Sequence, residues 1–243
     1  MIDTTFRTDE REIMDDFTLE GKALRDNLDI LSSINKWLGG NQVSLNGIQK
    51  LITNLPKEKE LVIVDLGCGN GDMLRRVSKL GKKLGCKFRL IGIDANKDSI
   101  QYATLLSLGF KNITYRQMNI FSNEFKELKY DIALSTLFLH HLNDQEILDK
   151  LNLLKEQAST GIVVNDLHRN KIAYFLFNVI SFFINNKIIR NDGLVSIRRG
   201  FKKGELEYFA KQLQIKSDIT WMWAFRYQWI ISFNCTKNQI RKY

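Results

Sequence analysis

Residues 61–72 read LVIVDLGCGNGD, an apolar run that passes directly into a cluster of three glycines. A short, continuously apolar run rich in valine, isoleucine and leucine is typical of a parallel strand that is buried on both faces. Gly67, Gly69 and Gly71 permit backbone conformations that other residues avoid, and they let a ligand approach the main chain closely. We therefore predict a strand, a glycine-rich turn and a helix in succession.

Similar stretches recur downstream and alternate with helical segments. The expected strands are 61–67, 88–94, 112–118, 130–136 and 161–166, and the expected helices are about 72–84, 96–108 and 144–157. This alternation predicts an α/β fold with right-handed crossovers. Two late runs, 219–224 and 227–235, are joined by only two residues, which requires antiparallel neighbours. We expect a Rossmann-like seven-stranded, mostly parallel sheet with an antiparallel C-terminal hairpin.

The chain before the first strand has a helical pattern. From residue 8 to about 55, apolar residues recur at spacings of three, four and seven, with an interruption at Gly39 and Gly40. A second helix is expected at about 43–54, before Pro56, the only proline. We predict an N-terminal helical cap over 1–55 and an α/β domain over 56–243, with a helical insertion at about 168–212.

Composition excludes several classes of protein. The 243 residues are 44% hydrophobic and 26% charged, as in ordinary globular domains. Cys68, Cys86 and Cys235 lack the spacing of a disulfide framework, a zinc knuckle or an iron–sulfur site. No basic region followed by an apolar stretch opens the chain, so we expect no secretory signal and a cytoplasmic location.

The formal net charge of +9 is unevenly distributed. Residues 1–20 hold seven acids and two bases, whereas residues 197–243 hold ten bases and three acids. A solvated basic face, an RNA-binding surface, an anionic membrane surface and an acidic substrate are all compatible with this pattern. Charge alone does not choose among them.

The glycine cluster departs from the dinucleotide-binding fingerprint, because Asp72 stands where GxGxxG needs glycine. An acid before a GxGxG turn instead resembles the first motif of class I methyltransferases, which use S-adenosylmethionine. In that family the loop wraps the amino-acid part of the cofactor. The resemblance therefore implies cofactor contacts from Asp65, Gly67, Cys68, Gly69 and Gly71.

Two later strand ends fit the same cofactor. Asp94 ends the second predicted strand 23 residues after Gly71, where a carboxylate can accept hydrogen bonds from both ribose hydroxyls and Ala95 follows it. A helix N-cap is the structural alternative for Asp94. Asn119 matches the position that reads the adenine amino group in the family, with Ile120 flanking the ring, although a turn role is open for Asn119.

The fourth predicted strand ends in STLFLHHL, residues 135–142, which resembles the fourth motif of the family in its small-molecule members. The resemblance places Ser135 beside the cofactor. His140 or His141 could accept a proton from a hydroxyl or hold the acceptor, or either could merely cap or pack. Asp166 and His168 follow the fifth strand, so His168 is a third candidate base and Asp166 could orient a histidine.

The likeness extends through most of the chain to methyltransferases of bacterial quinone and aromatic-polyketide pathways. It implies transfer of a methyl group to a hydroxyl or ring carbon of a small hydrophobic acceptor, leaving S-adenosylhomocysteine. Residues 172–184, IAYFLFNVISFFI, are too short to cross a bilayer but could form a core helix, line an acceptor pocket or touch a membrane. The substrate contacts expected in this region are Tyr174, Phe175 and Arg198.

Several expectations concern partners. No pair of acids ends the fourth strand, so we expect no metal. A single proline excludes the NPPY-type motif used on nucleic-acid bases, so we expect a small-molecule acceptor and no nucleic acid. The remaining alternatives are an RNA-directed methyltransferase that uses the basic C-terminal face and a non-catalytic cofactor-binding protein. Monomer and homodimer both stay open.

Overall fold

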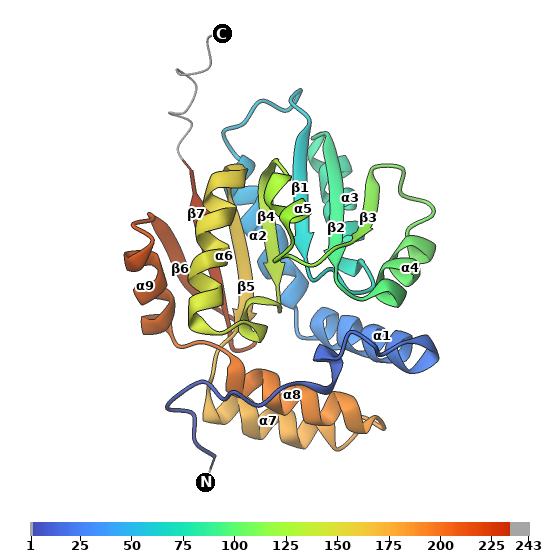
Figure 1. Cartoon of the computed structure of the whole chain (residues 1–243), viewed down its shortest axis with the longest axis vertical. Coiled ribbons are helices and arrows are strands. Elements are labelled where there is room, and N and C mark those ends of the chain that lie inside the picture. The colour runs from blue at the N-terminus through green and yellow to red at the C-terminus, as the bar shows by residue number, and fades with distance from the viewer. Residues whose placement is uncertain (1, 234–243) are drawn as a thin grey trace.

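The computed structural model describes residues 2–233, which form a sheet with helices on both faces and a further helical layer beyond one end of the strands (Figure 1). In this described part the sheet has seven strands in the order β3-β2-β1-β4-β5-β7-β6. The strands are β1 (Leu61–Leu66), β2 (Phe88–Asp94), β3 (Ile113–Gln117), β4 (Tyr130–Thr136), β5 (Ala158–Leu167), β6 (Ser217–Met222) and β7 (Arg226–Ser232). Strands β1 to β5 pair in parallel, and β7 runs antiparallel to β5 and β6. The predicted fold class is confirmed.

The helices and single turns connect these strands. They are η1 (Ile13–Asp15), α1 (Gly21–Trp37), α2 (Gly40–Ile52), α3 (Asp72–Leu84), α4 (Lys97–Leu106), α5 (Asn123–Glu127), η2 (Leu139–His141), α6 (Asp144–Gln157), α7 (Lys171–Ser181), α8 (Lys187–Arg199) and α9 (Lys203–Gln212). Residues 234 and 235 of the last expected strand, with Cys235, lie outside the described residues.

Apolar residues cover both faces of the sheet. On one face, Ile48 of α2 and Leu74 of α3 pack against Ile63 and Leu90 of the strands. On the other face, α5, α6 and α9 pack against the alternate strand residues. Because α2 lies directly on the sheet, only α1 stands apart from it in the N-terminal region (Figure 1). The division of the chain at residue 55 stays a prediction.

The expectation of a helix from residue 8 is wrong for residues 8–20, where the structure has only the single turn η1. The carboxylate of Asp192 in α8 accepts hydrogen bonds from the backbone N–H groups of Ile13 and Met14, both at 2.9 Å. The apolar spacing was misleading because Ile13 and Phe17 are exposed. This N-terminal segment, residues 2–20, runs along α8 (Figure 1).

The glycine turn has the geometry that its sequence predicts. Gly67, Gly69 and Gly71 all have positive φ angles, of 65°, 51° and 76°. A Cβ on Gly67 would lie 2.3 Å from the ring of Phe138, so no other residue fits between this turn and the segment after β4. The carboxyl ends of β1, β2, β4 and β5 therefore meet in one place, facing α1, α7 and α8 (Figure 1).

Candidate active site

A cavity of about 1180 Å³ lies at the carboxyl ends of the strands. One part is bordered by the turns after β1, β2 and β3, at residues 65–70, 94–96 and 118–121. The other is bordered by apolar side chains of α7, by the end of β5 and by residues 223–226 of the β6–β7 turn. Because β4 lies between β1 and β5, the histidines that follow β4 stand between the two parts. The volume exceeds that of a site for one small ligand.

Two carboxyl groups lie in the first part of the cavity, Asp65 buried and Asp94 partly buried. Asp94 accepts hydrogen bonds from the N–H groups of Gly69, at 3.0 Å, and Asn96, at 2.9 Å. Burial raises the pKa of Asp94, and burial together with the charge of Asp94 raises the pKa of Asp65 to about 8. The N-cap of α4 is Asn96, which accepts a hydrogen bond from Ser99, so the alternative role of Asp94 as that N-cap does not hold.

The turn after β3 forms another wall of this first part. Asn119 and Ile120 line the cavity there, and the side-chain oxygen of Asn119 accepts a hydrogen bond from the N–H of Phe121 at 2.9 Å. Lys150 of α6 is buried and donates a hydrogen bond to the carbonyl of Ile120. Sequence analysis does not single out this lysine, because a lysine in a helical pattern normally faces solvent.

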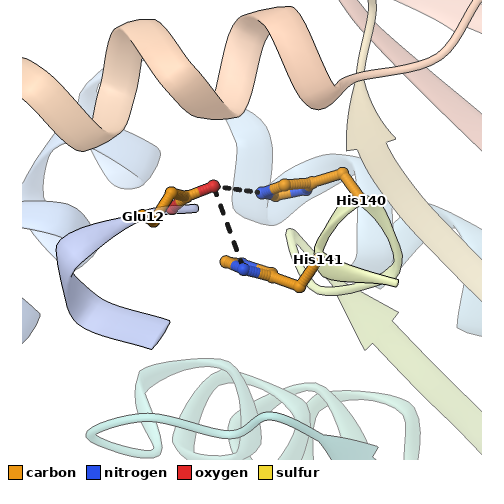
Figure 2. A group of neighbouring side chains, drawn as sticks. All are labelled: Glu12, His140 and His141. Carbon is orange, nitrogen blue, oxygen red and sulfur yellow. Dashed lines mark ion pairs between the residues drawn. The ribbon is translucent and has the colours of Figure 1, made fainter. Parts of the chain in front are cut away.

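His140 is buried between the carboxylates of Asp166 and Glu12. Figure 2 shows the side that faces Glu12. The Nδ1 of His140 lies 2.6 Å from Asp166 Oδ1, and its Nε2 lies 3.4 Å from Glu12 Oε1. Burial alone would lower the pKa of His140, but the charge and hydrogen bond of Asp166, helped by Glu12, raise it to about 9. His140 is therefore protonated at neutral pH and holds Glu12 of the N-terminal segment against the turn after β4.

His141 lines the cavity and is half-buried. Its Nδ1 lies 2.6 Å from Asp15 Oδ1, and the other oxygen of Asp15 accepts a hydrogen bond from Arg199 at 2.7 Å. Burial would raise the pKa of Asp15, but His141 and Arg199 lower it to about 2. With Nδ1–H donating to this carboxylate, Nε2 is the ring nitrogen of His141 that can accept a proton.

Glu12, His140 and His141 also offer ligand atoms that lie within 4.8 Å of one another (Figure 2). A metal ion there would displace the proton of His140 and compete with the short hydrogen bond between His141 and Asp15. The pairing of His140 Nδ1 with a carboxylate is also typical of metal-binding histidines, so the expected absence of a metal stays a prediction.

The structure brings most of the predicted site residues into this cavity and leaves others outside it. Its lining includes Asp65, Gly67, Cys68, Gly69, Asp94, Ala95, Asn119, Ile120, His140, His141 and His168. Outside the lining are Gly71, Ser135, Asp166, Tyr174, Phe175 and Arg198.

The residues outside the lining have other surroundings. Asp166 lies behind His140, Ser135 is buried within β4, Phe175 is 63% exposed on α7 and Arg198 pairs with Glu10. His168 borders the second part of the cavity, and its Nδ1 accepts a hydrogen bond from Trp221 at 3.2 Å.

The comparisons with known proteins agree on one kind of domain. Residues 57–172 match the family model described as a methyltransferase domain. A protein-lysine N-methyltransferase of Saccharomyces cerevisiae is 30% identical over 168 residues, which cover 65% of this chain and 70% of that protein. The ubiquinone biosynthesis O-methyltransferase of Rickettsia prowazekii is 28% identical over 59% of this chain, and the match spans 55% of that relative.

Solved structures share the fold. A plantazolicin methyltransferase in complex with SAH has a TM-score of 0.63 and 17% sequence identity, over 84% of this chain and 88% of that chain.

Proposed function

We propose that this chain, which belongs to the family of S-adenosylmethionine-dependent methyltransferases, methylates a hydroxyl group or ring carbon of a small hydrophobic aromatic, polyketide or quinone-like acceptor. The observation that carries the proposal is the undivided cavity. Its first part has the glycine turn and the carboxyls that the family uses for its cofactor, and its second part has apolar walls with a histidine beside them. A protein with this arrangement holds two ligands next to each other.

The cofactor fits the residues of the first part. The backbone of the turn at 67–71 would hold the amino-acid part, Asp94 would accept hydrogen bonds from the ribose, and Asn119 and Ile120 would border the adenine. Asp65 and Asp94 are two carboxyls in one buried place, where a cationic ligand is favoured over a neutral one. A sulfonium cofactor meets that requirement.

In an O-methylation, His141 would act as the general base. When bound, S-adenosylmethionine supplies an electrophilic methyl group, and the hydroxyl that receives it must lose a proton. His141 Nε2 accepts that proton, and Asp15 stabilises the imidazolium that results. His140 is already protonated and acts as a fixed positive charge, so the catalytic role predicted for it becomes a positioning role in this proposal.

The second part of the cavity favours a lipophilic acceptor. Ala173, Leu176, Phe177 and Ile180 line it from α7, and Trp223 and Phe225 line it from the β6–β7 turn. The name of the Rickettsia relative supports a quinone-like acceptor, whereas the name of the yeast relative supports a lysine side chain. The apolar lining of this second part suits a lipophilic small molecule better than the charged side chain of a lysine.

An acceptor screen tests the proposal. The protein would be incubated with radiolabelled S-adenosylmethionine and, separately, with hydroxylated aromatics and quinols, with transfer RNA and with a protein extract. We expect label in the small molecules, unchanged after dialysis against EDTA because no metal is predicted. Label confined to RNA or to protein would contradict the proposal, and the absence of all turnover would favour the non-catalytic alternative.

The outer face of α7 adds a proposed partner, the surface of an anionic membrane. Phe182 and Phe183, at the end of α7, are 74% and 83% exposed, and most of the outward residues of α7 are apolar. Residues 167–191 contain no acid, and Lys171 and Lys187 flank the apolar stretch. Basic residues beside an exposed apolar helix are typical of peripheral membrane contact. None of the helices within residues 2–233 could cross a bilayer.

A further inference from the structure

Arg226, the first residue of β7, is a buried cation that lines the cavity. It is 2% exposed and pairs in register with Leu167 of β5. Its Nε and Nη1 atoms are inaccessible to solvent and have no hydrogen-bond partner among the described residues. Burial lowers the pKa of Arg226 to about 10, so the guanidinium still carries its charge at neutral pH.

No carboxylate of the described chain neutralises this charge. Within residues 2–233, no acid lies within 4.0 Å of the Arg226 guanidinium. Asp166 attracts it from a distance, but the oxygens of Asp166 already accept hydrogen bonds from the ring of His140 and from the N–H groups of His140 and Leu167. An unpaired buried charge is strongly unfavourable unless a ligand supplies the opposite charge.

The surrounding chain is built to make room for the guanidinium. Gly40 begins α2, and a Cβ at that position would lie 2.1 Å from Asn35 Oδ1, 2.6 Å from Arg226 Cζ and 2.8 Å from Arg226 Nη1. The carbonyl of Gly40 is fixed in place, because it accepts a hydrogen bond from Asn165 of β5 at 2.8 Å. Arg226 therefore occupies a fixed space between α2 and the sheet.

We propose that Arg226 binds an ionised carboxylate of the methyl acceptor, which makes the acceptor a hydroxylated aromatic acid or a similar amphiphilic acid. This inference rests on the proposed function and narrows its substrate class. The donors of an arginine guanidinium lie in one plane, and in Arg226 the two N–H groups of Nη2 are the ones outside the inaccessible set, so they would donate to the carboxylate. An acid bound there would have its apolar part against the walls formed by α7 and the β6–β7 turn.

The position of Arg226 assigns it to the acceptor and not to the carboxylate of the cofactor. Strand β7 is separated from β1 by β4 and β5, whereas the cofactor turn directly follows β1. Its nearest neighbours along the chain in the cavity wall are Trp223, Ala224 and Phe225, on the acceptor side.

The test compares the carboxylate preference of the wild type with that of Arg226→Met and Arg226→Lys. Thermal shift and calorimetry, with SAH bound, would use 4-hydroxybenzoate and 6-hydroxy-2-naphthoate as probes and their uncharged carboxamides as controls. We expect the wild type to bind at least one acid at least tenfold more tightly than its amide, and Arg226→Met to lose that preference. Arg226→Lys should retain part of it, because the charge remains without the planar pair of donors. Arg89→Met removes an exposed arginine and should behave like the wild type.

Two further readouts separate the possible outcomes. Arg226→Met should melt at the same temperature as the ligand-free wild type or higher, because an apolar side chain replaces an unpaired charge. Lower stability of this variant would indicate a structural role and overturn the proposal. Equal binding of acids and amides by the wild type, or an acid preference that survives in Arg226→Met, would also overturn it. A selective loss of SAH affinity would assign Arg226 to the cofactor, whereas a wild type that binds no SAH would refute the proposed function itself.

Discussion

The contact between His141 and Asp15 joins residues 126 positions apart in the chain, and it supports our proposal that His141 is the base. We predict that His141→Gln lowers kcat for an O-methylated acceptor about 100-fold to 10,000-fold, the usual contribution of a general base. Asp15→Asn should lower kcat less, because the imidazole remains. Affinity for SAH, measured by calorimetry, should change less than threefold in both variants.

The control for this prediction is His168→Gln, which changes a cavity histidine whose Nδ1 faces Trp221. Its kcat should fall less than that of His141→Gln. A larger loss of kcat in His168→Gln than in His141→Gln would identify His168 as the base.

His140 should make stability depend on pH. Its folded pKa is raised above the ordinary value of 6.5 to about 9, so its contribution is fully present below pH 6.5 and is lost as the pH rises through 9. At 1.36 kcal/mol per pKa unit, that contribution reaches about 3 kcal/mol. We predict that His140→Gln destabilises the protein in urea unfolding at pH 6.5 and much less at pH 9.5. The same destabilisation at both pH values would show that His140 is not held as a cation.

Single residues were predicted unevenly from the sequence. Asp94 and the three glycines follow from their places at strand ends, where local sequence fixes the position of a side chain. Glu12, Asp15 and Arg226 were missed because their roles depend on contacts with residues far along the chain. The sequence analysis predicts no site role for the acids of residues 1–20, although two of them, Glu12 and Asp15, pair with the histidines.

At the scale of elements, the N-terminal segment completes the site from outside the α/β fold. It is anchored to α8 by Asp192 and Arg199, and it brings Glu12 and Asp15 to the histidines. We predict that Asp192→Ala releases this segment, because two backbone N–H groups lose their acceptor. Turnover should fall at least tenfold, and cleavage of residues 2–20 by trypsin should become faster, with the remaining fold intact by circular dichroism.

Asp26→Ala provides the control for that experiment, because Asp26 is an exposed acid that pairs only with Lys22. It should leave both cleavage and turnover as in the wild type. Unchanged protease sensitivity in Asp192→Ala would refute the anchoring role of Asp192.

The elements themselves were largely predictable. The strands feeding the site match within three residues at their described ends, because continuously apolar runs bounded by glycine or charge allow few other structures. The structure of residues 8–20 was not predictable, because their apolar residues have helical spacing although only the single turn η1 forms there. Whether residues 172–184 form a core helix or a pocket wall also required the structure, since α7 lines the cavity on one side and is exposed on the other.

At the scale of the whole molecule, α7 lines the cavity with one side and is exposed on the other. It lies in the helical layer beyond the ends of the strands (Figure 1). We predict that the protein sediments with vesicles of phosphatidylcholine and phosphatidylglycerol, and that Phe182→Ser with Phe183→Ser weakens this binding at least tenfold. The reason is the loss of two exposed aromatic rings. Higher salt should weaken binding of the wild type as well, because Lys171 and Lys187 face the anionic headgroups.

A matched pair outside this surface is Leu105→Ser with Leu108→Ser, which removes two exposed leucines at the end of α4. These changes should leave vesicle binding as it is. The wild type could instead form a dimer and fail to bind vesicles. If Phe182→Ser with Phe183→Ser then made the protein monomeric, the outer face of α7 would be a contact between two copies of the chain.

The central claim is that the turn after β1 and the carboxyl at the end of β2 form a cofactor site. Calorimetric titration with S-adenosylhomocysteine tests it most directly, with NADH in parallel and with Asp94→Asn as the variant. We predict micromolar binding of S-adenosylhomocysteine, none of NADH, and at least a tenfold loss of affinity in Asp94→Asn, because Asp94 accepts a hydrogen bond from Gly69 and, in our proposal, also binds the ribose. Failure of the wild type to bind S-adenosylhomocysteine, or equal affinity in Asp94→Asn, would contradict the assignment of this site.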